Sequence, residues 1–130
     1  MTMNKKSLLT IIFVFSLAYP LVNVYSSALE DPAGKWNFTA SSAPYGYNKG
    51  VIEINKDQDG YKTSISFDGL DYSFDLDKVM FRENKLTCSL YLEGEDISIV
   101  LTYDAQEDIL SGKAIYSMGE VPLSANRKKE

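Results

Sequence analysis

Groups that could act as nucleophiles or transfer protons are scarce in this sequence. Its 130 residues include no histidine, the side chain that most often serves as a general base and as a zinc ligand. The only cysteine, Cys88, alternates with Leu86 and Leu90 along an apolar run, where a thiol usually packs as a small inert hydrophobe. No imidazole is present to activate it, and no serine has the flanking glycines of a nucleophile elbow. We therefore expect that the protein is not an enzyme and holds no cofactor.

The segment Asp57–Gly60 resembles the start of a calcium-binding loop. Asp57 and Asp59 precede a glycine, but the further oxygen ligands and the closing glutamate of such a loop are missing. The chain continues instead into the strand-like run Tyr61–Thr63. Asp and Gly also tolerate the positive φ angles of a tight hairpin. A hairpin turn is therefore the better interpretation, and we predict no metal site.

Three further acids, Asp71, Asp75 and Asp77, fall on one face at strand spacing. Paired carboxylates of this kind can carry general acid–base chemistry. These three alternate with apolar residues at positions 72, 74 and 76, however. This alternation favours a solvated outer face, where like charges also discourage pairing with other chains.

Tyrosines are the side chains most suggestive of binding. Beyond residue 28 there are seven: Tyr45, Tyr47, Tyr61, Tyr72, Tyr91, Tyr103 and Tyr116. A buried tyrosine needs a partner for its hydroxyl, so inward tyrosines either give a cavity polar groups for a ligand or fill a narrow barrel with their hydroxyls at the rim. The short chain favours filling. Tyr45 and Tyr47 differ because they stand beside Pro44 and Gly46 in the long connection 40–48, where exposed aromatics indicate binding or a plug over the barrel mouth.

Residues 1–28 have the three parts of a secretory signal peptide. Lys5 and Lys6 form the basic region, residues 8–18 form the apolar region, and small residues end at Ala28, with Ser26 as a second option. A membrane-spanning helix, the alternative, needs roughly 20 continuous apolar residues. Here a Tyr-Pro pair and an asparagine interrupt the run, and no cysteine follows it to carry a lipid anchor. We predict an exported protein, periplasmic or secreted, with no stable membrane insertion after cleavage.

Residues 29–130 are expected to form one domain, because about 100 residues suffice for a single core. All 18 acidic residues lie in this part, whereas Lys5 and Lys6 leave with the leader, so its charge is more negative than the −5 of the whole chain. This sign argues against nucleic acid as a partner, because phosphate binding needs clustered Lys and Arg. The single cysteine also rules out an internal disulfide.

From Gly34 onward, apolar and polar residues alternate with a period of two, and no window has a helical stripe. The clearest alternating runs are residues 51–55, 61–67, 71–77, 86–92 and 97–103. Short turn-forming segments rich in Asp, Asn, Glu and Gly separate them, so successive strands should be neighbours. We predict an all-β fold, an up-and-down antiparallel meander β-barrel of about eight or nine strands.

Closure of the sheet is the physical reason for choosing a barrel. A meander of one-faced strands can cover its apolar side and lose both free edges by closing on itself. The first run, 34–38, and the last, 121–127, would then meet. A Greek-key sandwich would need a long crossover connection, and none follows Tyr47. The long connection 40–48 has the length and composition of a lid or rim loop.

With these residues in view, the chain resembles the calycins, the small meander barrels that include lipocalins and fatty-acid-binding proteins. The matching residues are Gly34 and Trp36 on the first strand and Arg127 after the last. The resemblance implies that the tryptophan lies across one end of the barrel and the arginine packs on its ring, a cation–π contact worth on the order of 1 kcal/mol. The chain is also similar to compact barrel modules of secreted bacterial proteins, through residues 110–114 and 121–123.

Two functions from different classes remain. The first is an exported, non-enzymatic barrel that binds a small apolar or amphipathic ligand at the end carrying Tyr45 and Tyr47. Inward residues, namely Tyr72, Phe74, Leu101 and Tyr103, would hold that ligand. The second is a filled-core interaction or inhibitor-like module that acts through its surface on another protein of the cell envelope. A pocket near Tyr45 would favour the first, and an exposed apolar patch there would favour the second.

Overall fold

The computed structural model describes residues 31–129, so the predicted signal peptide at 1–28 lies outside the described residues. Within this range every regular element is a β-strand. The strands are β1 (Gly34–Thr39), β2 (Lys49–Asp57), β3 (Gly60–Phe67), β4 (Ser73–Asp75), β5 (Asp77–Arg82), β6 (Lys85–Leu92), β7 (Glu95–Asp104), β8 (Ile109–Tyr116) and β9 (Gly119–Arg127). No helix in this range is long and apolar enough to cross a membrane.

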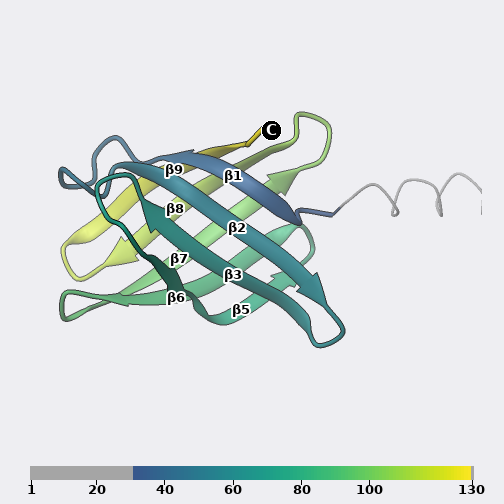
Figure 1. The fold of residues 1–130 in the computed structure, drawn as a ribbon, viewed down its shortest axis with the longest axis horizontal. Coiled ribbons are helices and arrows are strands. Elements are labelled where there is room, and N and C mark those ends of the chain that lie inside the picture. Colours follow the sequence, from purple (N-terminus) through teal and green to yellow (C-terminus); the bar gives the residue numbers. More distant parts are fainter. Residues whose placement is uncertain (1–30, 130) are drawn as a thin grey trace, which may run out of the picture. The chain divides into compact units, whose positions relative to one another are not determined.

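The strands form one antiparallel sheet in the order β4-β3-β2-β1-β9-β8-β7-β6-β5. Every strand pairs with the strands before and after it in the chain, except that β4 and β5 do not pair with each other. The sheet curls into a nearly closed barrel (Figure 1). The prediction of an up-and-down meander barrel of eight or nine strands is therefore confirmed. Alternation specifies this fold because each strand has only one apolar face to bury.

The first and last strands meet, as the sequence predicts. β1 lies between β2 and β9, and Trp36 faces Ile52 on one side and Arg127 on the other. The backbone ladder is extended by Lys128, whose N–H donates to the carbonyl of Lys35 at 2.8 Å. Pairing at β1 and β9 thus covers what would otherwise be the two terminal edges of the meander.

The two remaining edges of the sheet lie in the middle of the chain, at β4 and β5. The run 71–77 is not one strand, because Leu76 separates β4 from β5. Its N–H donates to the carbonyl of Thr63 at 2.9 Å, while β5 turns away to pair with β6 through a register shift between Asp77 and Met80. The expectation that closure removes every free edge is therefore wrong at this point. Side chains close the gap instead, with the rings of Tyr61 and Phe81 5.3 Å apart.

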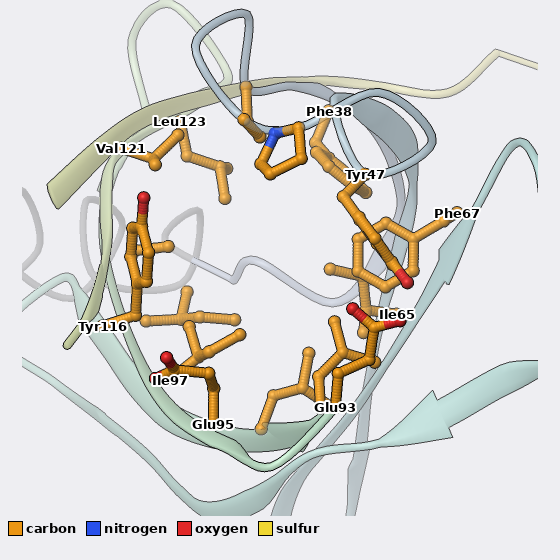
Figure 2. A pocket seen from close by; sticks show the side chains of 17 residues that line it. Phe38, Tyr47, Ile65, Phe67, Glu93, Glu95, Ile97, Tyr116, Val121 and Leu123 are labelled. Carbon is orange, nitrogen blue, oxygen red and sulfur yellow. The ribbon is translucent and has the colours of Figure 1, made fainter. Parts of the chain in front are cut away.

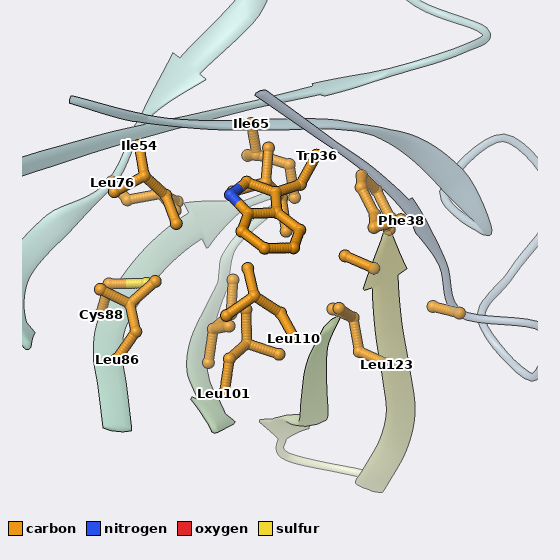
Figure 3. Packing of buried hydrophobic residues seen from close by; sticks show 14 of the residues in the cluster. Trp36, Phe38, Ile54, Ile65, Leu76, Leu86, Cys88, Leu101, Leu110 and Leu123 are labelled. Atoms are coloured by element: carbon orange, nitrogen blue, oxygen red, sulfur yellow. The ribbon is translucent and has the colours of Figure 1, made fainter. Parts of the chain in front are cut away.

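The interior follows the alternation of the sequence. The odd positions Thr63, Ile65 and Phe67 of β3 are buried, as are the even positions Leu86, Cys88 and Leu90 of β6. Trp36 is fully buried at one end, where it packs over Leu101 and Leu110 (Figure 3). Trp36 is the largest fully buried side chain, and its ring fills this end of the barrel.

Candidate functional site

A cavity of about 250 Å³ occupies the other end of the barrel (Figure 2). We call this the open end; its four connections are residues 40–48, 68–72, 93–94 and 117–118. The wall is mostly apolar and comes from β1, β3, β6, β7, β8 and β9, through residues such as Phe38, Ile65, Leu90, Ile97 and Val121. An apolar hollow with few polar groups is the usual form of a small-molecule site.

Side-chain size explains why this end is hollow. Three alanines, Ala40, Ala43 and Ala114, lie in its wall, where the filled end has Trp36. Gly50 at the start of β2 is also inward and lacks a side chain. A Cβ there would overlap the backbone oxygen of Ser66 and would lie 2.9 Å from the ring of Phe38. The glycine thus lets β2 and β3 curl closely around that ring without filling the cavity.

The connection 40–48 folds over part of the mouth. Its backbone bonds to itself, from the N–H of Ala40 to the carbonyl of Asn48 at 2.7 Å and from Tyr47 to Pro44 at 3.0 Å. These bonds place Pro44 and Tyr47 in the cavity wall, where the Tyr47 ring meets Phe67 edge-on at 5.1 Å. Tyr45, at the tip of the same connection, is 97% exposed. The loop therefore contributes one aromatic to the cavity and presents the other to solvent.

Two glutamates supply the charge at the mouth. Glu93 and Gly94 have φ angles of 52° and 80°, which makes the tight hairpin turn between β6 and β7. Glu95 then occupies the first inward position of β7, in line with Ile97. The hydroxyl of Tyr47 donates a hydrogen bond to Glu93, and this bond raises the pKa of Tyr47. Ser117 Oγ donates to Glu95 Oε1 at 2.6 Å.

The structure places the residues predicted to bind a ligand in different parts of the barrel. Tyr47 lines the cavity. Tyr72 is 59% exposed and meets the ring of Phe74 edge-on, and Phe74 in turn meets the cavity-wall residue Phe67 edge-on. Leu101 is buried in the core. Tyr103 lies at the filled end against Trp36, with ring centres 5.8 Å apart, and so does not line the cavity.

Sequence reasoning did not single out Glu93 or Glu95, and it named Tyr116 only as one of seven tyrosines; all three line the cavity. A signal for two of them exists. Glu95 has the same parity as Ile97 on β7, and Tyr116 has the same parity as Ala114 on β8. Both therefore face inward, next to turns at the open end. Glu93 belongs to the turn itself, where parity gives no direction.

At the filled end, Trp36 meets three groups. Its indole Nε1 donates to the carbonyl of Pro32 at 2.9 Å. The ring of Tyr103 lies edge-on to it, and the guanidinium carbon of Arg127 lies 4.3 Å from the centre of its ring. The cation–π contact that the calycin resemblance implies is therefore present.

Arg127 also ties the chain ends to the β7–β8 turn. It forms a two-point ion pair with Asp108, at 2.7 and 3.0 Å, and donates to the carbonyl of Ala33 at 2.6 Å. Tyr103 donates to the same Asp108 carboxylate at 3.0 Å. These bonds, those from Arg127 above all, hold the pKa of Asp108 below its usual value. Gly34 leaves room for the arginine, because a Cβ there would lie 2.6 Å from a guanidinium nitrogen.

The remaining residues that the sequence offered for chemistry, Cys88 and Asp57, are held in structural contacts. Burial raises the pKa of the Cys88 thiol to about 12, so the thiolate is not available at neutral pH. Asp57 accepts a hydrogen bond from the N–H of Asp59 at 2.8 Å and pairs with Lys62 at 3.2 Å, within the β2–β3 hairpin. Among residues 31–129, no three His, Cys, Asp or Glu side chains gather as a metal site would require.

These features define the protein as a small antiparallel β-barrel with one end filled by Trp36 and Arg127 and the other hollow. No family model, curated protein or solved structure matches the chain.

Proposed function

We propose that this protein is an exported, calycin-like barrel that binds a small apolar or amphipathic molecule in the cavity at its open end. The observation that carries the proposal is the cavity itself, an apolar hollow beneath the Tyr47 connection. Its polar groups, Tyr47, Glu93, Glu95 and Tyr116, give a bound molecule partners for one polar end. The lack of histidine and of an accessible thiolate supports binding rather than catalysis.

The size of the cavity limits the ligand. At about 250 Å³ it exceeds the roughly 150 Å³ that accommodates benzene in an engineered apolar cavity. It lies just under the roughly 300 Å³ at which sites for drug-sized molecules begin. With roughly 30 Å³ for each water-sized group, about eight such groups fit. An alkyl chain of about eight carbons, or a bicyclic ring system, matches this volume.

Calorimetric titration with 1-octanol tests the proposal. We expect saturable binding of one molecule per barrel. Ala114→Phe should weaken it by about tenfold or more, equivalent to about 1.4 kcal/mol, because the added ring takes cavity space. The matched control is Ser98→Phe, which adds the same ring on the exposed face of β7. Equal binding by both variants, or none by the wild type, would contradict the proposal.

Export is supported by the signal-peptide features of residues 1–28. The mass of the protein recovered from the periplasm or the medium is expected to correspond to loss of about 28 residues. Recovery of the full-length chain from the cytoplasm would remove this part of the proposal and leave the cavity unaffected.

A second candidate is an interaction module that contacts an envelope protein through the open end. Three of its four connections expose a large apolar side chain, with Tyr45 97%, Tyr72 59% and Met118 82% exposed. Such residues suit a protein interface. Native mass spectrometry of the protein from its own envelope separates the candidates, because it detects a retained small molecule or a bound protein. Replacing Tyr45 and Met118 by serine should remove a protein partner but leave 1-octanol bound.

A further inference from the structure

Two carboxylates face the cavity at its mouth. The side chain of Glu95 points to the cavity because it continues the inward line of Ile97 and Ile99 along β7. Glu93 stands beside it in the preceding turn, and both lie at the edge of the hollow in Figure 2. Any molecule that fills the apolar part of the cavity therefore has its outer end next to two acids.

Within residues 31–129, the partners found for these acids are neutral. Ser117 donates to Glu95 and Tyr47 donates to Glu93. The ion pairs found among residues 31–129 are Lys62–Asp57, Lys113–Glu120 and Arg127–Asp108, and none of them includes either glutamate. Half-buried Glu95 thus lies beside an apolar wall, and no ion pair of the described part of the chain includes it.

The rest of the open end adds to the negative electrostatic field of the two glutamates. Its four connections contain the acids Asp68, Asp71 and Glu93 but no lysine or arginine. The nearest basic residue along the chain is Lys49, which begins β2 and is exposed. Fields of one sign around a low-dielectric cleft concentrate ligands of the opposite charge.

We infer that the ligand is a cationic amphiphile, an apolar group of about eight carbons that carries an ammonium or similar cation at one end. This rests on the proposed function and names the ligand class. The apolar part fills the cavity, and the cation meets the carboxylates of Glu93 and Glu95. The rings of Tyr47 and Tyr116 stand in the same wall and offer cation–π contacts. Anionic amphiphiles such as fatty acids meet like charge at the same place.

Three probes with one tail test the inference: octylammonium, 1-octanol and octanoate, titrated calorimetrically at neutral pH and low salt. We expect octylammonium to bind about tenfold or more tighter than 1-octanol, a difference of about 1.4 kcal/mol, and octanoate to bind more weakly than 1-octanol. Added salt should weaken octylammonium binding only, because it screens the charges.

Variants assign the preference to the two acids. The double substitution Glu93→Gln with Glu95→Gln should remove the charge preference, so that octylammonium and 1-octanol bind the variant with similar affinity. Asp96→Asn is the matched control, because it removes one charge beside Glu95 on the outer, exposed face of β7. Thermal melting of each variant verifies that the barrel is intact, and Ala114→Phe verifies that the probes enter the cavity.

The possible failures can be told apart. Equal binding of 1-octanol and octylammonium, or tightest binding of octanoate, would overturn the cationic ligand class while the binding function stands. A charge preference that persists in the double variant would also overturn it, because the acids would not be its source. Absence of binding by all three probes would remove the binding function together with the inference.

Discussion

At the filled end, Arg127 holds three separate parts of the chain together. Its guanidinium lies over the Trp36 ring, pairs with Asp108 in the β7–β8 turn and donates to Ala33 just before β1. The planar fork of arginine suits this role because it can donate in several directions while its face stacks on a ring. About a third of the side chain remains exposed, so water weakens each charge contact. We therefore expect the buried indole to contribute more stability than the cation above it.

Truncation of the two side chains separates these contributions. Trp36→Ala should lower the free energy of unfolding by roughly 3–5 kcal/mol, because the ring is fully buried. Arg127→Ala should lower it by about 1–2 kcal/mol, since one cation–π contact and one partly exposed ion pair are lost. Urea unfolding followed by circular dichroism measures both. An unchanged transition for Trp36→Ala would show that the ring does not stabilise this end.

The Asp108 carboxylate makes this end sensitive to acid. The hydrogen bonds from Arg127, followed by that from Tyr103, hold its folded-state pKa below the usual 3.8. A lowered pKa contributes stability above the unfolded value, and this stability is lost as the pH falls through the folded value. The stability advantage of the wild type over Asp108→Asn should therefore shrink between about pH 5 and pH 2. Urea midpoints across this pH range measure the loss of the advantage. The stability advantage of the wild type over Arg127→Met should shrink over the same range, because that variant lacks the partner of Asp108. A difference that stays constant with pH would assign the effect to something other than ionisation.

At the scale of the elements, alternation in the sequence predicts most of the barrel. The inward positions of β3, β6 and β7 follow from a period of two, since each strand buries one face. The break at Leu76 does not follow, because residues 71–77 also alternate. A bulge with Lys78 at a φ of 54° redirects the chain there. That conformation depends on the ladder with β6 rather than on local composition.

This break leaves β5 with a ladder on only one side, so side chains must hold its other edge. Phe81→Ala should lower the free energy of unfolding by about 1–2 kcal/mol, less than for a fully buried ring, because the half-buried phenylalanine packs on Tyr61. Amide exchange in residues 77–82 should become faster than in β8, since the loss opens the edge locally. Met80→Ala is the control, because that side chain is 55% exposed on the same strand. Uniform acceleration in all strands would instead indicate a global loss of stability.

At the scale of the whole molecule, the filled and hollow ends explain which site residues could be predicted. Parity shows that Tyr103 and Tyr116 face inward, but the end at which each lies depends on the strand direction. β7 runs toward the filled end and β8 runs back, so Tyr103 meets Trp36 and Tyr116 reaches the cavity. Each hairpin reverses the chain, so the number of hairpins between β1, which carries Trp36, and a later strand gives the direction of that strand. The volume left beside Ala40, Ala43 and Ala114 does not follow from counting, because it depends on how tightly the strands curl.

That volume leads to a prediction about chain length. In a series of 1-alkanols, each methylene that enters the cavity should strengthen binding by up to about 0.8 kcal/mol, which is about fourfold. The increase should stop near eight to ten carbons, because about 250 Å³ is then filled and further methylenes remain in water. Calorimetric titration from 1-pentanol to 1-dodecanol measures the break.

Ala114→Phe should move this break to shorter chains, whereas Ser98→Phe on the outer face should leave it in place. A break that follows cavity volume can come only from binding inside the barrel. Affinity that rises steadily to 1-dodecanol in all three proteins would instead indicate adsorption on the exposed apolar side chains Tyr45, Tyr72 and Met118. In that case the open end would act as a contact surface, as the second candidate function requires.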